Sequence, residues 1–204
     1  MKNKKHNKEF IVFIFFTLTL LITSVYYVRV KDIEKIFRIL LNFITITGAY
    51  LLYISGFLKG SRVIYYINMI FIFLSMYLAS ILNFYSIKNY DKFLHLLSGF
   101  VIAIIGYVLF LYLTNEKSRE EMSPLAATIF VVLFSIATAG AWEIWEFTTD
   151  SIFGLNAQNG NLNDTMWDII CGTGVGIITS IPIYLHDKGR QVRIIRYIID
   201  DIKR

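Results

Sequence analysis

The stretch FLHLLSGFVIAIIGYVLFLYL, residues 93–113, decides the fold of this chain. It contains one histidine and no Lys, Arg, Asp or Glu, and a helix of about 20 mostly apolar residues is long enough to cross a bilayer. Five further runs are similarly apolar: residues 10–28, 39–57, 63–82, 125–147 and 165–185. The sequence therefore predicts an all-α, polytopic membrane helix bundle with six transmembrane helices.

Composition agrees with a membrane protein. Of the 204 residues, 56% are hydrophobic and only 17% are charged, which is unusual for a water-soluble domain. Six spans occupy most of the chain, so we expect residues 1–204 to form a single integral membrane domain. The net charge of +5 comes from loops and tails between apolar runs. This placement favours the lipid bilayer as the partner, and we expect no nucleic acid to bind.

The distribution of basic residues predicts the orientation of the spans. Most of the 20 Lys and Arg lie in the N-terminal segment, the second and fourth loops and the C-terminal tail, including Lys2, Lys4, Lys5, Lys59, Lys203 and Arg204. The fifth loop, residues 148–164, contains no Lys or Arg. By the positive-inside rule both termini are cytoplasmic, in a multi-pass protein of the cell (cytoplasmic) membrane.

The tail, residues 190–204, has Ile and Val at helical spacing with charged residues between them. This pattern predicts an amphipathic helix at the cytoplasmic surface of the membrane. A helix that binds a partner protein is the alternative.

Acidic side chains and one histidine gather at three span ends that this topology places on the extracytoplasmic face. The members of each set share one helix face, because they lie about one or two turns apart: Asp91 and His95; Glu143, Glu146 and Asp150; Asp164 and Asp168. Charged residues at such depths cost up to about 2.5–3.5 kcal/mol each near the bilayer centre. Protons, Lys92 or a bound cation must offset them.

A divalent metal cation satisfies this requirement, since hard cations prefer oxygen ligands and an imidazole completes a mixed site. The metal ligands predicted here are His95, Glu143, Glu146, Asp150 and Asp168. The predicted catalytic carboxylates, which include the general base, are Glu143, Asp91 and Asp164. Lys92 and Gln158 are the predicted substrate-binding residues. The hypothesis is a metal-dependent membrane hydrolase or transferase that acts on an envelope lipid or a lipid-linked phosphate.

Other interpretations stay open at this point. Asp91 and Asp164 stand where helix N-caps belong, and Thr165 with Asp168 fits a capping box. The cluster as a whole is also compatible with a proton- or cation-coupled transporter, or with a non-catalytic membrane scaffold. Gly172 and Gly176, four residues apart, predict close helix packing in the sixth span.

The second half of the chain resembles the YjdF-like predicted inner-membrane proteins of bacteria. The resemblance rests on DKFLHLLSGF from Asp91, WEIWEFTTD from Trp142 and GLNAQNGNLNDTMWDIICGTGVG from Gly154. More distantly, the D-K-x-x-H start and the later acid before a glycine-bearing helix are similar to VanZ-like membrane proteins. Glu146 departs from that pattern, and so does the lack of an Arg before Asp164. The resemblance implies a membrane location and supplies no reaction.

Overall fold

The computed structural model describes residues 7–55, 61–154, 157, 158 and 160–202. Over these residues every regular element is a helix, and six helices are long and apolar enough to cross a membrane. The all-α fold with six candidate spans is therefore confirmed. By their internal contacts the residues form two compact units, one within residues 1–88 and 201–204 and one within residues 89–200. The single integral membrane domain stays a prediction.

The first unit contains three spans. They are α1 (Asn7–Arg29), α2 (Ile33–Ser55) and α3 (Arg62–Ile72), which continues as a π-helical segment, η1 (Phe73–Ile81), before the short 3₁₀ turn η2 (Phe84–Ser86). Apolar and aromatic side chains from all three spans form its core, including Leu20, Ile46, Tyr53 and Tyr65. The buried Lys35 ammonium donates to the Ser80 carbonyl and to Asn83 where the third span ends.

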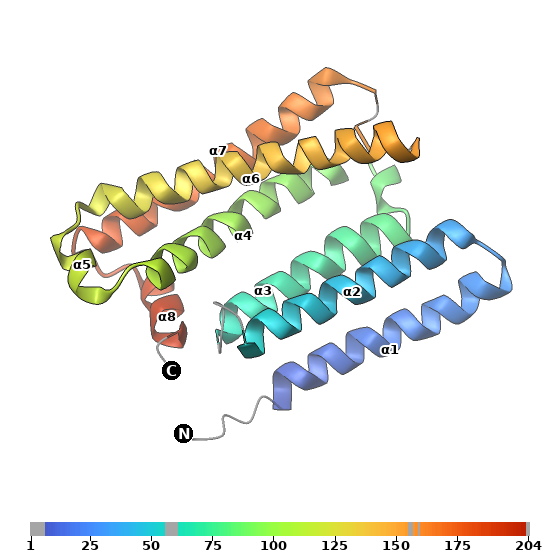
Figure 1. The fold of residues 1–204 in the computed structure, drawn as a ribbon, viewed down its shortest axis with the longest axis horizontal. Coiled ribbons are helices and arrows are strands. Elements are labelled where there is room, and N and C mark those ends of the chain that lie inside the picture. Colours follow the sequence, from blue (N-terminus) through green and yellow to red (C-terminus); the bar gives the residue numbers. More distant parts are fainter. Residues whose placement is uncertain (1–6, 56–60, 155–156, 159, 203–204) are drawn as a thin grey trace. The chain divides into compact units, whose positions relative to one another are not determined.

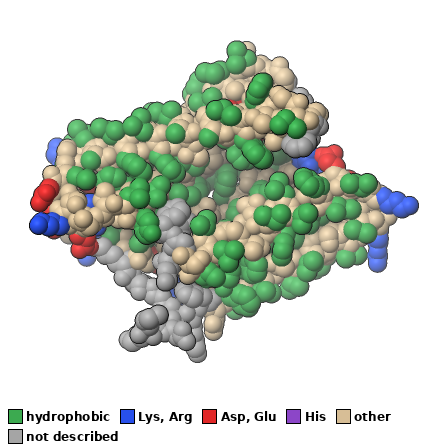
Figure 2. Space-filling view, in the orientation of Figure 1, with side chains coloured by type: hydrophobic (Ala, Val, Ile, Leu, Met, Phe, Trp, Pro, Cys, Tyr) green, Lys and Arg blue, Asp and Glu red, His purple; other side chains and the backbone are tan. Residues whose placement is uncertain are grey.

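The second unit contains α4 (Tyr90–Leu113), the short α5 (Glu116–Glu121), α6 (Pro124–Phe153), α7 (Leu162–Asp187) and most of α8 (Arg193–Ile202). Each of α4, α6 and α7 contacts the other two along its length (Figure 1). Hydrophobic side chains cover much of the visible surface of the helices, with charged side chains gathered toward helix ends (Figure 2). This distribution suits helices surrounded by lipid.

Helices extend beyond the predicted apolar runs at the ends that carry acids. Compared with the predicted bounds, α4 begins at Tyr90 rather than Phe93, α6 ends at Phe153 rather than Phe147, and α7 begins at Leu162 rather than Thr165. Hydropathy ends a predicted span where the sequence becomes mostly polar, whereas the backbone hydrogen bonds of the helix continue into the polar residues. Asp91, Asp150 and Asp164 are consequently helical residues.

The predicted amphipathic helix is present as α8, and its apolar side packs on protein. Ile195 belongs to a buried cluster with Ala103, Tyr107, Val131 and Ile183. Ile194 and Tyr197, on the other side of α8, are exposed. The position of α8 at the membrane surface and the cytoplasmic location of both termini stay predictions.

Some predictions fall on residues outside the described ranges. These residues are the basic Lys2, Lys4, Lys5, Lys59, Lys203 and Arg204, and the end of the second predicted span at residues 56–57.

Candidate functional site

Small residues set the spacing of α4, α6 and α7. A Cβ atom added to Gly99 would lie 2.2 Å from the backbone oxygen of Gly172, so α4 and α7 approach each other at their backbones. A Cβ on Gly172 would lie 3.5 Å from the Cβ of Ala139 in α6, and one on Gly176 would lie 2.6 Å from that of Ser135. The close packing predicted for Gly172 and Gly176 is therefore found.

This layer of small residues brings three polar side chains to one level of the bundle. Each polar residue lies four positions, or about one helical turn, from a small residue of this layer, and always toward the same end of the bundle. The pairs are His95 before Gly99, Glu143 after Ala139 and Asp168 before Gly172. The antiparallel course of α6 explains why its polar residue follows the small residue instead of preceding it. The convergence of the three span ends follows from this packing.

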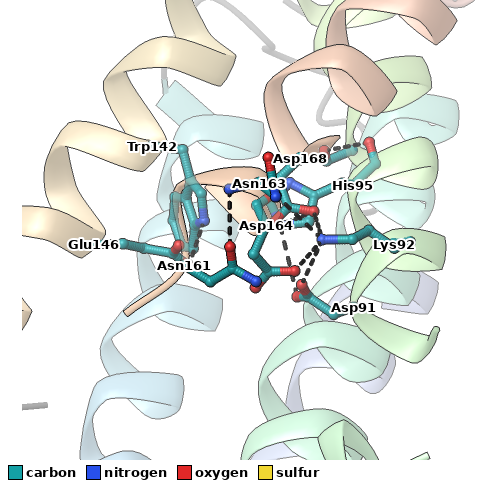
Figure 3. Close-up of polar contacts among 10 residues, drawn as sticks. Asp91, Lys92, His95, Trp142, Glu146, Asn161, Asn163, Asp164 and Asp168 are labelled. Carbon is teal, nitrogen blue, oxygen red and sulfur yellow. Dashed lines mark hydrogen bonds and ion pairs between the residues drawn. The ribbon is translucent and has the colours of Figure 1, made fainter. Parts of the chain in front are cut away.

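Lys92 is the centre of the polar contacts between α4 and α7. Its Nζ lies 2.6 Å from Oδ1 of Asp164 and 2.6 Å from Oδ1 of Asp168, and 3.8 Å from Oδ2 of Asp91. Figure 3 shows its side chain extended between these carboxylates. One ammonium group is thus shared by three aspartates, of which Asp168 is the most buried.

Asp91, His95 and Asp168 form a donor set suited to a cation. One ligand atom from each lies within 4.8 Å of the other two. Nε2 of His95 is 3.6 Å from Oδ1 of Asp91 and 3.8 Å from Oδ1 of Asp168. Ligand atoms held about 2.0–2.2 Å from one ion are separated by about 3–4 Å. The three side chains therefore stand close to the spacing that a common ion requires.

Glu143 is buried without a hydrogen-bond partner. Glu143 is only 5% exposed, and neither of its carboxylate oxygens is hydrogen-bonded within the described part of the chain. It borders a cavity of about 560 Å³ between the end of α6 and the start of α7. A buried polar group normally has a partner, because leaving it unpaired costs about 1–3 kcal/mol. Glu143 is thus a polar group available to a ligand.

The remaining predicted residues of α6 have other partners. Glu146 accepts a hydrogen bond at Oε1 from Nε1 of Trp142, 2.9 Å away (Figure 3). Asp150 accepts from the backbone N–H groups of Ala157 and Gln158, at 2.8 and 3.0 Å. Asp150 therefore holds the loop after α6, and the structure does not bring it to the Asp91, His95 and Asp168 set.

Gln158, predicted to bind substrate, lies in this loop beside α6. Its Nε2 donates to the backbone oxygen of Glu143 at 3.3 Å, and Gln158 borders the same cavity as Glu143. The neighbouring loop residues Asn156 and Asn159 lie outside the described residues.

Neither Asp91 nor Asp164 is the N-cap of its helix. The N-cap of α4 is Asn89 and the N-cap of α7 is Asn161, whose side chain accepts from the Asn163 N–H. The expectation that Asp91 and Asp164 occupy cap positions is wrong, because both helices begin earlier than their apolar runs. The capping box of Thr165 with Asp168 is wrong for the same reason. Asp91 and Asp164 lie in the first turns of these helices, and both face the ammonium group of Lys92.

Sequence reasoning missed Gly99 and Asn161. Gly99 stands four residues after His95, as Gly172 stands four after Asp168, and this shared spacing is a signal that could have predicted the α4–α7 contact. Asn161 precedes an apolar run with an acid three residues later, which is typical of a helix start.

The fold and the polar cluster define a class of protein, a membrane-spanning helix bundle with ionisable residues concentrated at one end of three of its helices. The chain belongs to the family described as predicted membrane protein (DUF2238), whose model matches residues 6–189.

A curated relative shares part of this sequence. A protein of Thermotoga maritima, described as an uncharacterized protein, is 40% identical over 101 residues, which is 48% of this chain and 50% of the relative. The chain thus matches about half the length of that relative. No solved structure matches the chain. The YjdF-like resemblance is consistent with this family, and the VanZ-like resemblance stays a prediction.

Proposed function

We propose that this protein is a divalent-metal-dependent hydrolase or transferase of the cell membrane that acts on an envelope lipid or a lipid-linked phosphate. The observation that carries the proposal is the donor set of Asp91, His95 and Asp168, whose ligand atoms lie within 4.8 Å of one another. Three protein ligands with further positions open to water or substrate are typical of catalytic metal sites.

The charge of the cluster supports a cation. Lys92 is shared by Asp91, Asp164 and Asp168, and one ammonium group balances one of the three carboxylates. Carboxylates within a membrane-spanning segment are costly unless they are paired. A divalent ion at Asp91 and Asp168 would bring this set to neutrality.

Lys92 and the metal would then both bind a substrate phosphate. Lys92 now contacts Oδ1 of Asp168, and a cation at that carboxylate would compete with the ammonium group. An ammonium released in this way pairs readily with phosphoryl oxygens, while the metal polarises the phosphorus centre. In the proposal Gln158 also belongs to the substrate-binding side, since it borders the cavity next to Glu143.

Glu143 supplies the general base in this proposal. Both of its oxygens are without a hydrogen-bond partner among the described residues, so they are available to accept a proton from a water or a substrate hydroxyl. Asp164, which pairs with Lys92 at 2.6 Å, orients that ammonium group. In this proposal Glu146 and Asp150 stabilise α6 and the loop after it through the contacts described above.

Elemental analysis of protein purified without chelator tests the metal. We expect about one divalent ion per chain in the unmodified protein, and its loss in His95→Ala and Asp168→Asn, because both remove a ligand. Asp200→Asn is the matched control, since Asp200 is exposed on α8, where its carboxylate lies 3.8 Å from Nε of Arg196. An unmodified protein that stays metal-free after incubation with Mn²⁺ or Zn²⁺ would overturn the proposal.

A comparison of envelope lipids tests the substrate. Cells that produce the Asp168→Asn chain should accumulate one phosphate-bearing lipid relative to cells that produce the Asp200→Asn chain. Identical lipid profiles in the two strains would contradict the lipid part of the proposal and leave the metal part standing.

A further inference from the structure

The cavity between α6 and α7 has apolar walls. Ile144 and Phe147 line it from α6, and Leu162 and Ile169 line it from α7. Ile144, Phe147 and Leu162 also have exposed side chains, so the cavity opens on the surface of two membrane-spanning helices. Its volume of about 560 Å³ falls within the range of about 300–1,000 Å³ that is typical of small-molecule sites. A hydrocarbon chain from the bilayer suits such walls.

Gly140 keeps this cavity open on the α6 side. It lines the cavity, and a Cβ atom added to it would meet nothing within 4 Å. The space next to Gly140 is therefore not occupied by a neighbouring helix. A larger side chain at this position would take up part of the cavity.

A carboxylate that accepts hydrogen bonds lies at one end of the cavity. Glu143 lines the cavity, is 5% exposed and has two carboxylate oxygens without a partner in the described part of the chain. An ionised carboxylate has no hydrogen to donate. The group that completes it must bring a hydrogen-bond donor or a positive charge.

Gln158, in the loop after α6, borders this end of the cavity. Backbone N–H groups of Ala157 and Gln158 bind Asp150, and the Gln158 side chain donates to the Glu143 carbonyl. The loop amides are thereby used on Asp150 and on the backbone of α6, and they leave the Glu143 carboxylate unpaired. An occupant of the cavity can supply a donor to this carboxylate.

We propose that this cavity binds a lipid by its hydrocarbon chain and selects a head group that donates hydrogen bonds, through a hydroxyl or an ammonium group, to Glu143. The inference rests on the proposed function in that it takes this lipid to be the substrate. Lipid binding itself is measurable without any reaction.

The experiment measures lipid affinity of the purified full chain by native mass spectrometry. Three probes with the same acyl chains separate the head groups: diacylglycerol has a hydroxyl, phosphatidylethanolamine has an ammonium donor, and phosphatidylcholine has neither. We expect the first two to bind about tenfold or more tightly than the third, as one charge-assisted hydrogen bond allows. Equal affinity for all three would overturn the inference.

Two glycine variants test the location. Gly140→Leu fills the cavity and should weaken binding of all three lipids about tenfold or more. Gly174→Leu is the matched control: its Cβ also meets nothing within 4 Å, it does not line the cavity, and it should bind like the unmodified chain. Glu143→Gln gives an independent variant that should reduce the preference for phosphatidylethanolamine over phosphatidylcholine. Unchanged binding by Gly140→Leu would overturn the inference.

Metal content of the same preparations separates the two proposals. Gly140→Leu should keep its metal, because Gly140 is outside the donor set. Head-group selection in a chain that never binds metal would support the inference and overturn the proposed catalysis. Stoichiometric metal without head-group selection would overturn the inference alone.

Discussion

The backbone oxygen of Gly172 occupies the position that a side chain on Gly99 would need, 2.2 Å from an added Cβ atom. This contact holds α4 against α7 one turn below His95 and Asp168. The distance of 3.8 Å between Nε2 of His95 and Oδ1 of Asp168 depends on it. The packing of two glycines is therefore part of the candidate site.

Gly99→Ala should destabilise the protein by about 1–3 kcal/mol, because the added methyl group meets backbone and one helix must shift. Thermal unfolding in detergent measures the loss. Gly174→Ala is the control, since a Cβ there meets nothing within 4 Å and alanine favours the helix. Equal unfolding temperatures for the two variants would mean that α4 and α7 do not touch at Gly99.

Lys92→Gln separates a metal site from a self-sufficient ionic network. Loss of the ammonium leaves Asp164 and Asp168 without their 2.6 Å partner, so stability without added metal should fall by about 1–3 kcal/mol. Mn²⁺ should restore it and should bind more tightly than to the unmodified chain, because no ammonium competes at Asp168. Unfolding temperatures with and without Mn²⁺ measure both effects.

Lys188→Gln controls for the loss of a positive charge, because Lys188 is at the C-terminal end of α7, away from the aspartates that contact Lys92. There its ammonium lies over the ring of Tyr184, 5.7 Å from the ring centre. If Lys92→Gln is equally destabilised at every Mn²⁺ concentration, the scaffold interpretation is favoured over the metal site.

Asp150→Ala should loosen the loop after α6 and leave the metal in place. Both carboxylate oxygens of Asp150 accept loop N–H groups, and each such bond contributes about 0.5–1.5 kcal/mol. We expect faster hydrogen exchange at the amides of Ala157 and Gln158, with Asp200→Ala exchanging as the unmodified chain does. Loss of metal in Asp150→Ala would instead show that Asp150 is a metal ligand, as the sequence predicts.

Hydropathy was enough to predict the six spans, because each needs only a long apolar run. The course of the third span was not predictable, since the π-helical segment Phe73–Ile81 is apolar like the α-helix before it. The starts of α4 and α7 were predicted too late, because charged residues in their first turns find partners in space that hydropathy ignores.

The residues of the candidate site were visible in the sequence, but their partners were not. The i, i+4 spacing of Asp91 and His95 fixes a shared face on one helix. It carries no information on which residue of another helix they meet. The shared contacts of Lys92 and the isolation of Glu143 depend on the α4–α6–α7 packing, and hence on small residues such as Gly99.

Labelling of single cysteines tests the predicted orientation. In a Cys171→Ser background, Ser151→Cys near the end of α6 should react with a membrane-impermeant maleimide in intact cells. Glu120→Cys in α5 should react only after lysis, because the positive-inside rule places that loop in the cytoplasm. Both residues are exposed. The reverse labelling pattern would place the polar cluster on the cytoplasmic face.

A Mn²⁺ titration followed by electron paramagnetic resonance tests the central claim most directly. After removal of metals with chelator, the protein should bind about one Mn²⁺ per chain, with a nitrogen coupling from the imidazole of His95. His95→Ala should lose that coupling, and Asp168→Asn should lose saturable binding, while Asp200→Asn keeps both. Absence of saturable binding, or binding unchanged in His95→Ala and Asp168→Asn, would contradict a metal site at these helix ends.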